Sequence, residues 1–161
     1  MGLSLDTQRS LRIAGLLHDV GKVGVPDNLL RKPARLSDEE YEAIKQHVVL
    51  GELIIKGIPN MREVVSAVGS HHECLDGTGY PRGLKGTEIP LLGRILAVAD
   101  AYAAMTTDRP YRKALPPEAA QVELRRVSGT QLDPRMVGAF LELLQADEQC
   151  VAASLAVTVP V

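Results

Sequence analysis

The stretch LLHDVGKVGVPD, residues 16–27, places a histidine and an aspartate side by side at the end of an apolar run, followed by a glycine and a lysine. Ser4 can cap a helix whose apolar residues favour one side, and Gly21 suits its C-terminal end. We therefore expect His18 and Asp19 in the last helical turn. Since consecutive helical residues point about 100° apart, both side chains can reach one site that lies off the helix end.

Capping and breaking signals divide the rest of the sequence into helices and connectors. Residues 25–35 contain two prolines and predict a connector, and residues 71–90 are rich in glycine and predict an irregular loop. Helices are expected from the capping box Ser37–Glu40 to about Lys56, from Asn60 to His71–Glu73, from Leu91 to Thr106, after Pro116, and from Asp133 to near Leu144. No strand pattern is convincing. The sequence predicts an all-α bundle, with one domain in residues 1–145 and a C-terminal tail in residues 146–161.

Composition narrows the classes of function. The 161 residues are 45% apolar, enough for one compact core, and their formal net charge of -2 argues against a DNA or RNA polymer as partner. The two cysteines, Cys74 and Cys150, lie far apart and have no metal-type spacing. No stretch is long and apolar enough to span a membrane, so a cytoplasmic protein without membrane contact is expected.

The histidines and one aspartate suggest a metal site. All four histidines lie at helix ends or beside apolar faces, and Asp100 is the only charged residue in the apolar run 95–105. A buried carboxylate is costly unless it is paired or binds a metal, and we favour metal binding over an ion pair with arginine. The candidate ligands are His18, Asp19, His47, His71, His72 and Asp100.

This ligand set has nitrogen and oxygen donors but no thiolate, which suits iron, manganese or zinc. Six donors exceed the needs of one tetrahedral ion, so two ions bridged by a carboxylate are plausible. Such pairs of ions neutralise a phosphate during in-line displacement, which indicates phosphoester hydrolysis. Lys22, Arg109 and Arg112 are candidate phosphate-binding cations, although each could also be a solvated surface residue.

Four motifs occur in order along the chain: HDVGK from His18, HHE from His71, DGTGYP from Asp76, and RPYR from Arg109. Together they resemble the HD-GYP family of bacterial cyclic di-GMP phosphodiesterases. The resemblance covers about residues 11–144. It implies an HD-superfamily helical bundle with an irregular GYP loop, two or three divalent metal ions, most often iron, and hydrolysis of cyclic di-GMP to pGpG and GMP.

The resemblance also implies roles for individual residues. Asp19 would be the bridging ligand, and Lys22 the cation beside the scissile phosphate. Arg109 and Arg112 would bind ligand phosphates. The remaining metal ligands would be His18, His47, His71, His72 and Asp100. The GYP loop, with Asp76, Gly77, Gly79, Tyr80 and Pro81, would lie by the site, with Tyr80 near the substrate, and would dock GGDEF-domain proteins.

Two departures from the family pattern keep alternatives open. Relatives supply a further histidine from an upstream helix, and none of the 17 residues before His18 is a histidine. The expected explanations are an N-terminally trimmed chain, which we favour, a homodimer that completes the site, or a weakened metal position. Ala103 stands where relatives carry a second aspartate. A catalytically weak binding or docking module is therefore the main alternative, and an HD hydrolase of nucleoside phosphates or alarmones is disfavoured by the intact GYP and RPYR segments.

Overall fold

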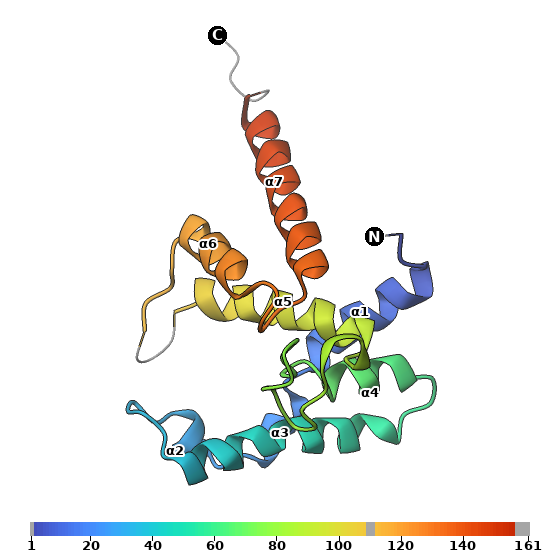
Figure 1. Ribbon diagram of the computed structural model, residues 1–161, viewed down its shortest axis with the longest axis vertical. Helices are drawn as coiled ribbons and strands as arrows, with labels where there is room; N and C mark the ends of the chain where they lie inside the picture. Colours follow the sequence, from blue (N-terminus) through green and yellow to red (C-terminus); the bar gives the residue numbers. More distant parts are fainter. Residues whose placement is uncertain (1, 109–111, 157–161) are drawn as a thin grey trace.

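The computed structural model describes residues 2–108 and 112–156, and these residues form an all-helical fold (Figure 1). In chain order the helices are α1 (Leu5–Leu17), α2 (Asp27–Leu30), α3 (Asp38–Lys56), α4 (Arg62–Val68), α5 (Leu91–Thr106), α6 (Pro117–Val127) and α7 (Pro134–Ala156). Two 3-10 turns, η1 (Val20–Gly24) and η2 (Gly86–Glu88), lie between them. Ser128 and Leu132 form an isolated bridge. The predicted all-α class is confirmed.

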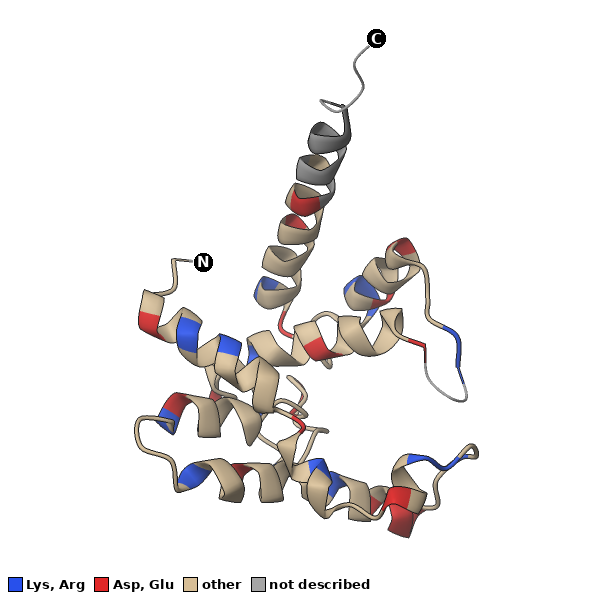
Figure 2. Ribbon diagram, turned by 180° about the vertical axis from the view of Figure 1, so that it is seen from behind, with Lys and Arg blue, Asp and Glu red and all other residues tan. Residues whose placement is uncertain are grey.

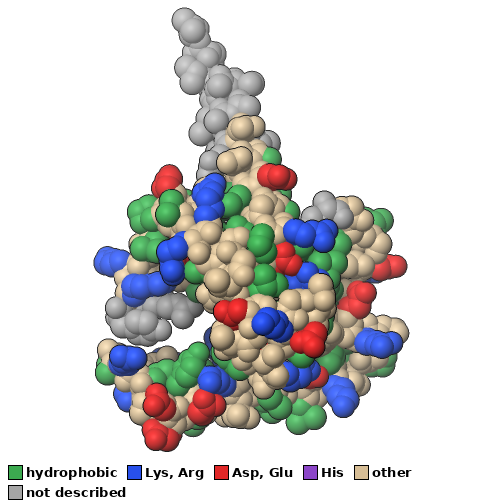
Figure 3. All heavy atoms as spheres, in the orientation of Figure 1, with side chains coloured by type: hydrophobic (Ala, Val, Ile, Leu, Met, Phe, Trp, Pro, Cys, Tyr) green, Lys and Arg blue, Asp and Glu red, His purple; other side chains and the backbone are tan. Residues whose placement is uncertain are grey.

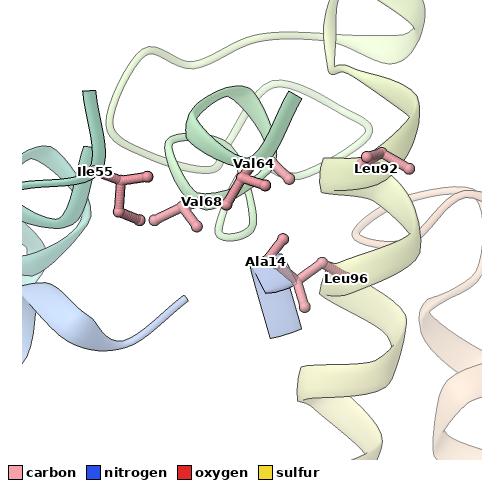
Figure 4. Close-up of a cluster of buried hydrophobic side chains, with 7 residues drawn as sticks. Ala14, Ile55, Val64, Val68, Leu92 and Leu96 are labelled. Carbon is pink, nitrogen blue, oxygen red and sulfur yellow. The ribbon is translucent and has the colours of Figure 1, made fainter. Parts of the chain in front are cut away.

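α5 is the central helix because both hydrophobic cores use it. The first core packs α1, α3 and α4 against the first half of α5, and Figure 4 shows its members Ala14, Ile55, Val64, Val68, Leu92 and Leu96. The second core places Val98 of α5 against Leu124 of α6 and Met136, Val137 and Leu141 of α7. α7 projects away from the rest of the molecule (Figure 1).

A buried ion pair joins α5 to the start of α7. The Nη1 atom of Arg94 donates to Oδ2 of Asp133 at 2.6 Å, and the two side chains are 16% and 7% exposed. The other carboxylate oxygen of Asp133 accepts from the backbone N–H of Arg135 at 2.8 Å. Burial by itself would raise the pKa of Asp133, but these hydrogen bonds outweigh it and lower the pKa.

Local capping signals predicted two helix starts correctly. The Ser4 side chain accepts from the backbone N–H of Thr7 at 3.1 Å, and Ser37 and Glu40 form a complete capping box at α3. The first turn of α3 also gathers acidic residues, seen as red segments in Figure 2, where the helix dipole favours negative charge.

Several expected boundaries are wrong. α1 ends at Leu17, and Asp19 (φ −97°, ψ 5°) leads into η1 because Gly21 must pack closely on α3. The connector 25–35 contains the single turn α2. α4 begins after Met61, not at Asn60, which has a φ of 61°, and it ends at Val68, before His71.

The last helix is also longer than expected. α7 continues past Leu144 to Ala156, because residues 145–156 contain good helix formers and neither glycine nor proline. The predicted division between residues 145 and 146 stays a prediction, although no helix end marks it. Among the described residues, none of the helices has the length and hydrophobicity that crossing a bilayer requires.

Candidate metal centre

Three histidine rings are fixed by the backbone three residues before them. The Nδ1 atoms of His18, His47 and His71 lie 2.8, 2.7 and 2.7 Å from the carbonyl oxygens of Gly15, Ile44 and Val68. Because a carbonyl oxygen only accepts, each Nδ1 carries the proton. In the neutral form of such a ring, Nε2 has a lone pair for a ligand, which is the usual arrangement of metal-binding histidines.

These rings converge on one point. Ligand atoms of His47, His71 and His72 all lie within 4.8 Å of one another. The ring centroid of His18 is 5.3 Å from that of His71. The Nε2 atoms of His47 and His71 are buried without any hydrogen-bond partner. Buried unpaired nitrogens are rare in folded proteins, and a metal ion would satisfy both at once.

Two carboxylates complete the cluster. Asp19 lies between two rings, with Oδ2 3.4 Å from Nε2 of His18 and Oδ1 3.5 Å from Nε2 of His47. Asp100 lies on α5, and its Oδ1 atom is 3.5 Å from Nε2 of His18. All six predicted metal-binding side chains therefore lie in one cluster, with Asp19 between the rings of His18 and His47.

Burial and the neighbouring carboxylates set the charge of the rings. It lowers the pKa of His71 to about 4 and also lowers the pKa of His47 and His72, so these imidazoles are neutral and able to bind a metal. Hydrogen bonds to Asp100 and Asp19 raise the pKa of His18 to about 10. Burial raises the pKa of Asp19, but its bonds to His18 and Lys22 outweigh this, so Asp19 stays ionised.

A close backbone approach holds Asp19 beside His47. A Cβ atom on Gly21 would overlap the carbonyl oxygen of His47 and lie 2.5 Å from the backbone nitrogen of Gly51. Only glycine lets η1 approach α3 this closely. Gly21 of the HDVGK motif is thus needed to bring Asp19, which precedes η1, close to His47 of α3.

The GYP loop reaches the cluster through Tyr80. The Tyr80 ring stacks on the His72 ring, with centroids 4.8 Å apart, and its backbone N–H donates to the His72 carbonyl at 3.1 Å. A Cβ atom on Gly79 would lie 2.5 Å from Cα of Glu73, so this approach also requires glycine.

The outer part of the GYP loop turns away from the cluster. Asp76 accepts from the backbone N–H and the hydroxyl of Thr78 at 2.9 and 2.6 Å, and Gly77 has a φ of 87°. The backbone of Asp76 donates to the Thr130 carbonyl at 2.9 Å, next to the start of α7. Pro81 is exposed. Among the predicted loop residues, Tyr80 is the one that contacts a metal-ligand candidate.

The predicted cations are not all at the cluster. Nζ of Lys22 lies 2.6 Å from Oδ2 of Asp19, at the edge of the cluster. Arg112 donates to the carbonyl of Ala104, one turn beyond Asp100 on α5, at 2.6 Å and is exposed. Arg109 lies outside the described residues. The phosphate-binding roles of both arginines stay predictions.

Sequence reasoning missed three residues around the site. Glu73 is 3% exposed, and its carboxylate accepts from the backbone N–H groups of Arg82 and Leu84 at 2.8 and 3.0 Å, which fixes the GYP loop. Tyr41 packs edge-on against Tyr80, with centroids 6.3 Å apart. Nζ of Lys45 lies 4.8 Å from the Tyr41 ring and 5.4 Å from the Tyr80 ring. The position of Glu73 inside HHE was the one available signal.

The donor chemistry fits iron, manganese or zinc, since four imidazoles and two carboxylates meet. Cys74 is half-buried, and burial raises the pKa of its thiol, which disfavours the thiolate form that binds metals. The arrangement can hold divalent ions next to a lysine ammonium group, in a place that an anionic substrate would reach.

Comparisons with known proteins agree with this geometry. The profile of the HD domain family matches residues 1–136. The chain is 43% identical over 145 residues to a cyclic di-GMP phosphodiesterase of Thermotoga maritima, covering 89% of this chain and 39% of that protein. It is 40% identical over 134 residues to a 3'3'-cGAMP-specific phosphodiesterase of Vibrio cholerae, covering 83% and 29%.

A solved structure shares the fold. An HDG"Y"P protein from Bdellovibrio bacteriovorus superposes with a TM-score of 0.68 at 22% identity, over 86% of this chain and 44% of that one. The chain thus spans less than half the length of the relatives described here.

Proposed function

The chain belongs to the HD domain family, and from this premise we propose that it is a metal-dependent phosphodiesterase that hydrolyses cyclic di-GMP to pGpG, GMP or both. The observation that carries the proposal is the convergence of four imidazoles and two carboxylates, with two buried Nε2 atoms that have no partner. The names of relatives at about 40% identity, which cleave cyclic dinucleotides, support the same substrate class.

We propose that His18, His47, His71, His72, Asp19 and Asp100 hold two or three divalent ions, with iron preferred over manganese and zinc. Ions bound there would polarise phosphoryl oxygens and increase the acidity of a bound water. Asp19 contacts the rings of His18 and His47 and the ammonium group of Lys22, so it would hold these side chains in position.

Lys22 supplies a positive charge at the edge of the cluster. Its ammonium group is held by Asp19 at 2.6 Å and is 40% exposed, so a phosphodiester can reach it. Fixed positive charge beside the phosphorus stabilises the negative charge that develops on the phosphoryl oxygens in the transition state. Tyr80, stacked on His72, lies on another side of the cluster.

The test is anaerobic incubation of this chain, loaded with ferrous or manganous ion, with cyclic di-GMP, followed by chromatography of the products. We expect pGpG or GMP from the unaltered chain and none from Asp19→Ala. The matched control is Asp27→Ala, because Asp27 is an exposed aspartate of α2 that is paired with Arg31. Turnover by the Asp19→Ala variant would contradict the proposed mechanism.

A catalytically weak binding module is the second candidate, and Ala103 favours it. Position 103 lies on α5 three residues after Asp100 and offers no carboxylate beside it. Calorimetric binding of cyclic di-GMP without any product would support this candidate. Rapid turnover would eliminate it.

We further propose that the exposed side of the GYP loop, at Asp76, Thr78 and Pro81, docks a GGDEF-domain protein. Thr78→Arg should then weaken binding to a GGDEF protein in a titration and leave hydrolysis unchanged. The predicted homodimer is tested by analytical ultracentrifugation, where a single monomeric species would exclude it.

A further inference from the structure

A hollow lies next to the metal cluster and is not explained by metal binding. It has a volume of about 740 Å³, within the range typical of small-molecule sites, and is formed by α2, the segment 32–37 and the start of α3. Lys22 and Tyr41 both line it. Lys22 contacts the cluster at Asp19, and Tyr41 contacts Tyr80, which stacks on His72, so the hollow adjoins the cluster at two places.

The lining of this hollow suits a flat heterocycle. Leucines and a proline form apolar walls, with Leu29, Leu30 and Leu36 among them, and Tyr41 offers an aromatic ring. Three charged side chains line it besides Lys22, and these are Lys32, Arg35 and Asp38. Lys32 is paired with Glu40 at 2.6 Å, as Lys22 is with Asp19.

The remaining charges favour a base over a second phosphate. Asp38 belongs to the acidic first turn of α3, and Figure 3 shows negative as well as positive side chains on this corner of the molecule, where Figure 1 draws α2. An anion would be repelled by that carboxylate. A guanine would not, because its N1–H and N2–H groups donate to a carboxylate while O6 and N7 accept from an arginine.

We propose that this hollow is the base subsite of the enzyme and selects guanine over adenine through Asp38 and Arg35. The assignment rests on the proposed function, since it takes a nucleotide phosphate at Lys22 as given. Adenine presents an acceptor at N1 and a donor at its 6-amino group, so it leaves one of the two side chains without a matching partner.

The test uses GMP and AMP, which differ only in the base and contain no diester that can be cleaved. Binding to the manganese-loaded chain is measured by calorimetry, with ribose 5-phosphate as the base-free probe. We expect tighter binding of GMP than of AMP, and loss of roughly 5- to 150-fold in that preference in Arg35→Ala and in Asp38→Ala, the range given by one good base contact.

Two neighbours serve as matched controls. Arg31 and Glu39 are exposed, flank the lining residues 32–38 and do not line the hollow, so Arg31→Ala and Glu39→Gln should keep the preference. Circular dichroism checks that each variant is folded. Equal binding of GMP, AMP and ribose 5-phosphate, or an unchanged preference in both test variants, would overturn the proposal. A preference for GMP in a chain that does not cleave cyclic di-GMP would refute the proposed reaction while leaving the base subsite in place.

Discussion

Replacing Gly21 by alanine tests the close approach that builds the metal cluster. The new Cβ atom would overlap the carbonyl oxygen of His47 and lie 2.5 Å from the nitrogen of Gly51. Both are backbone atoms of α3 and cannot swing aside as a flexible side chain could. η1 must therefore move away from α3 and take Asp19 with it.

The expected cost follows from overpacking a rigid site. Overpacking destabilises by about 1–3 kcal/mol, occasionally more, and a backbone obstacle belongs at the upper end, so we expect about 3 kcal/mol for Gly21→Ala. For a chain of this size, 1 kcal/mol shifts the unfolding midpoint by roughly 2–4 °C. The midpoint should fall by about 6–12 °C.

Gly15→Ala is the matched control. Gly15 lies in α1, and a Cβ atom there would meet nothing within 4 Å. Alanine is favoured over glycine inside a helix by about 0.5–1 kcal/mol, so this variant should unfold at a slightly higher temperature than the unaltered chain.

Thermal unfolding followed by circular dichroism measures both variants, and metal analysis gives the bound ions per chain. We expect Gly21→Ala to lose stability and bound metal together, because Asp19 is displaced from His47. If Gly21→Ala unfolded at the same temperature as Gly15→Ala, the packing of η1 on α3 described above would be incorrect.

Three further predictions concern the loop, the ion pair and the ligands. Glu73→Gln should lower stability by about 1–3 kcal/mol in urea unfolding, because an amide cannot accept from both Arg82 and Leu84; an unchanged midpoint would argue against this loop anchor. Asp133→Asn should be destabilising at pH 7, and since the folded pKa of Asp133 is lowered, its contribution is complete above the unfolded pKa and is lost as the pH falls through the folded pKa. The difference in unfolding free energy between Asp133→Asn and the unaltered chain should therefore shrink between pH 5 and pH 2, roughly the window set by an unfolded carboxyl pKa near 3.9, and a constant difference would refute the ion-pair role. Manganese at about 100 times its dissociation constant should stabilise the unaltered chain by about 2.7 kcal/mol, and a His71→Ala variant that gained as much would exclude His71 as a ligand.

Much of the fold could be predicted because its helices carry their own start signals. Ser37 and Glu40 fix the beginning of α3 through a local capping box, and the apolar run after Pro90 predicts α5 with both ends correct. Local patterns could not predict where α1 and α4 end. The turn after His18 is imposed by packing of Gly21 on α3, a contact between segments about 26 residues apart in the chain.

The candidate ligands could be found from residue type and order, since titratable groups in apolar surroundings are costly without a partner. The surroundings of the cluster could not. Tyr41 repeats with helical spacing beside Ile44 and Val48 and looks like a packing position of α3. Its contact and that of Lys45 with Tyr80 arise only when the GYP loop folds over α3. The contacts of Glu73 likewise depend on the backbone N–H groups of Arg82 and Leu84, whose direction is set by the conformation of the loop.

The carbonyl contacts of His18, His47 and His71 have a thermodynamic consequence. Each ring is held in one orientation before any ligand arrives, so the loss of side-chain rotation has already occurred during folding. Immobilising a free side chain costs roughly 0.5–1.5 kcal/mol, and three preorganised rings spare that cost three times when an ion enters. Preorganisation of this kind favours tight binding of an ion.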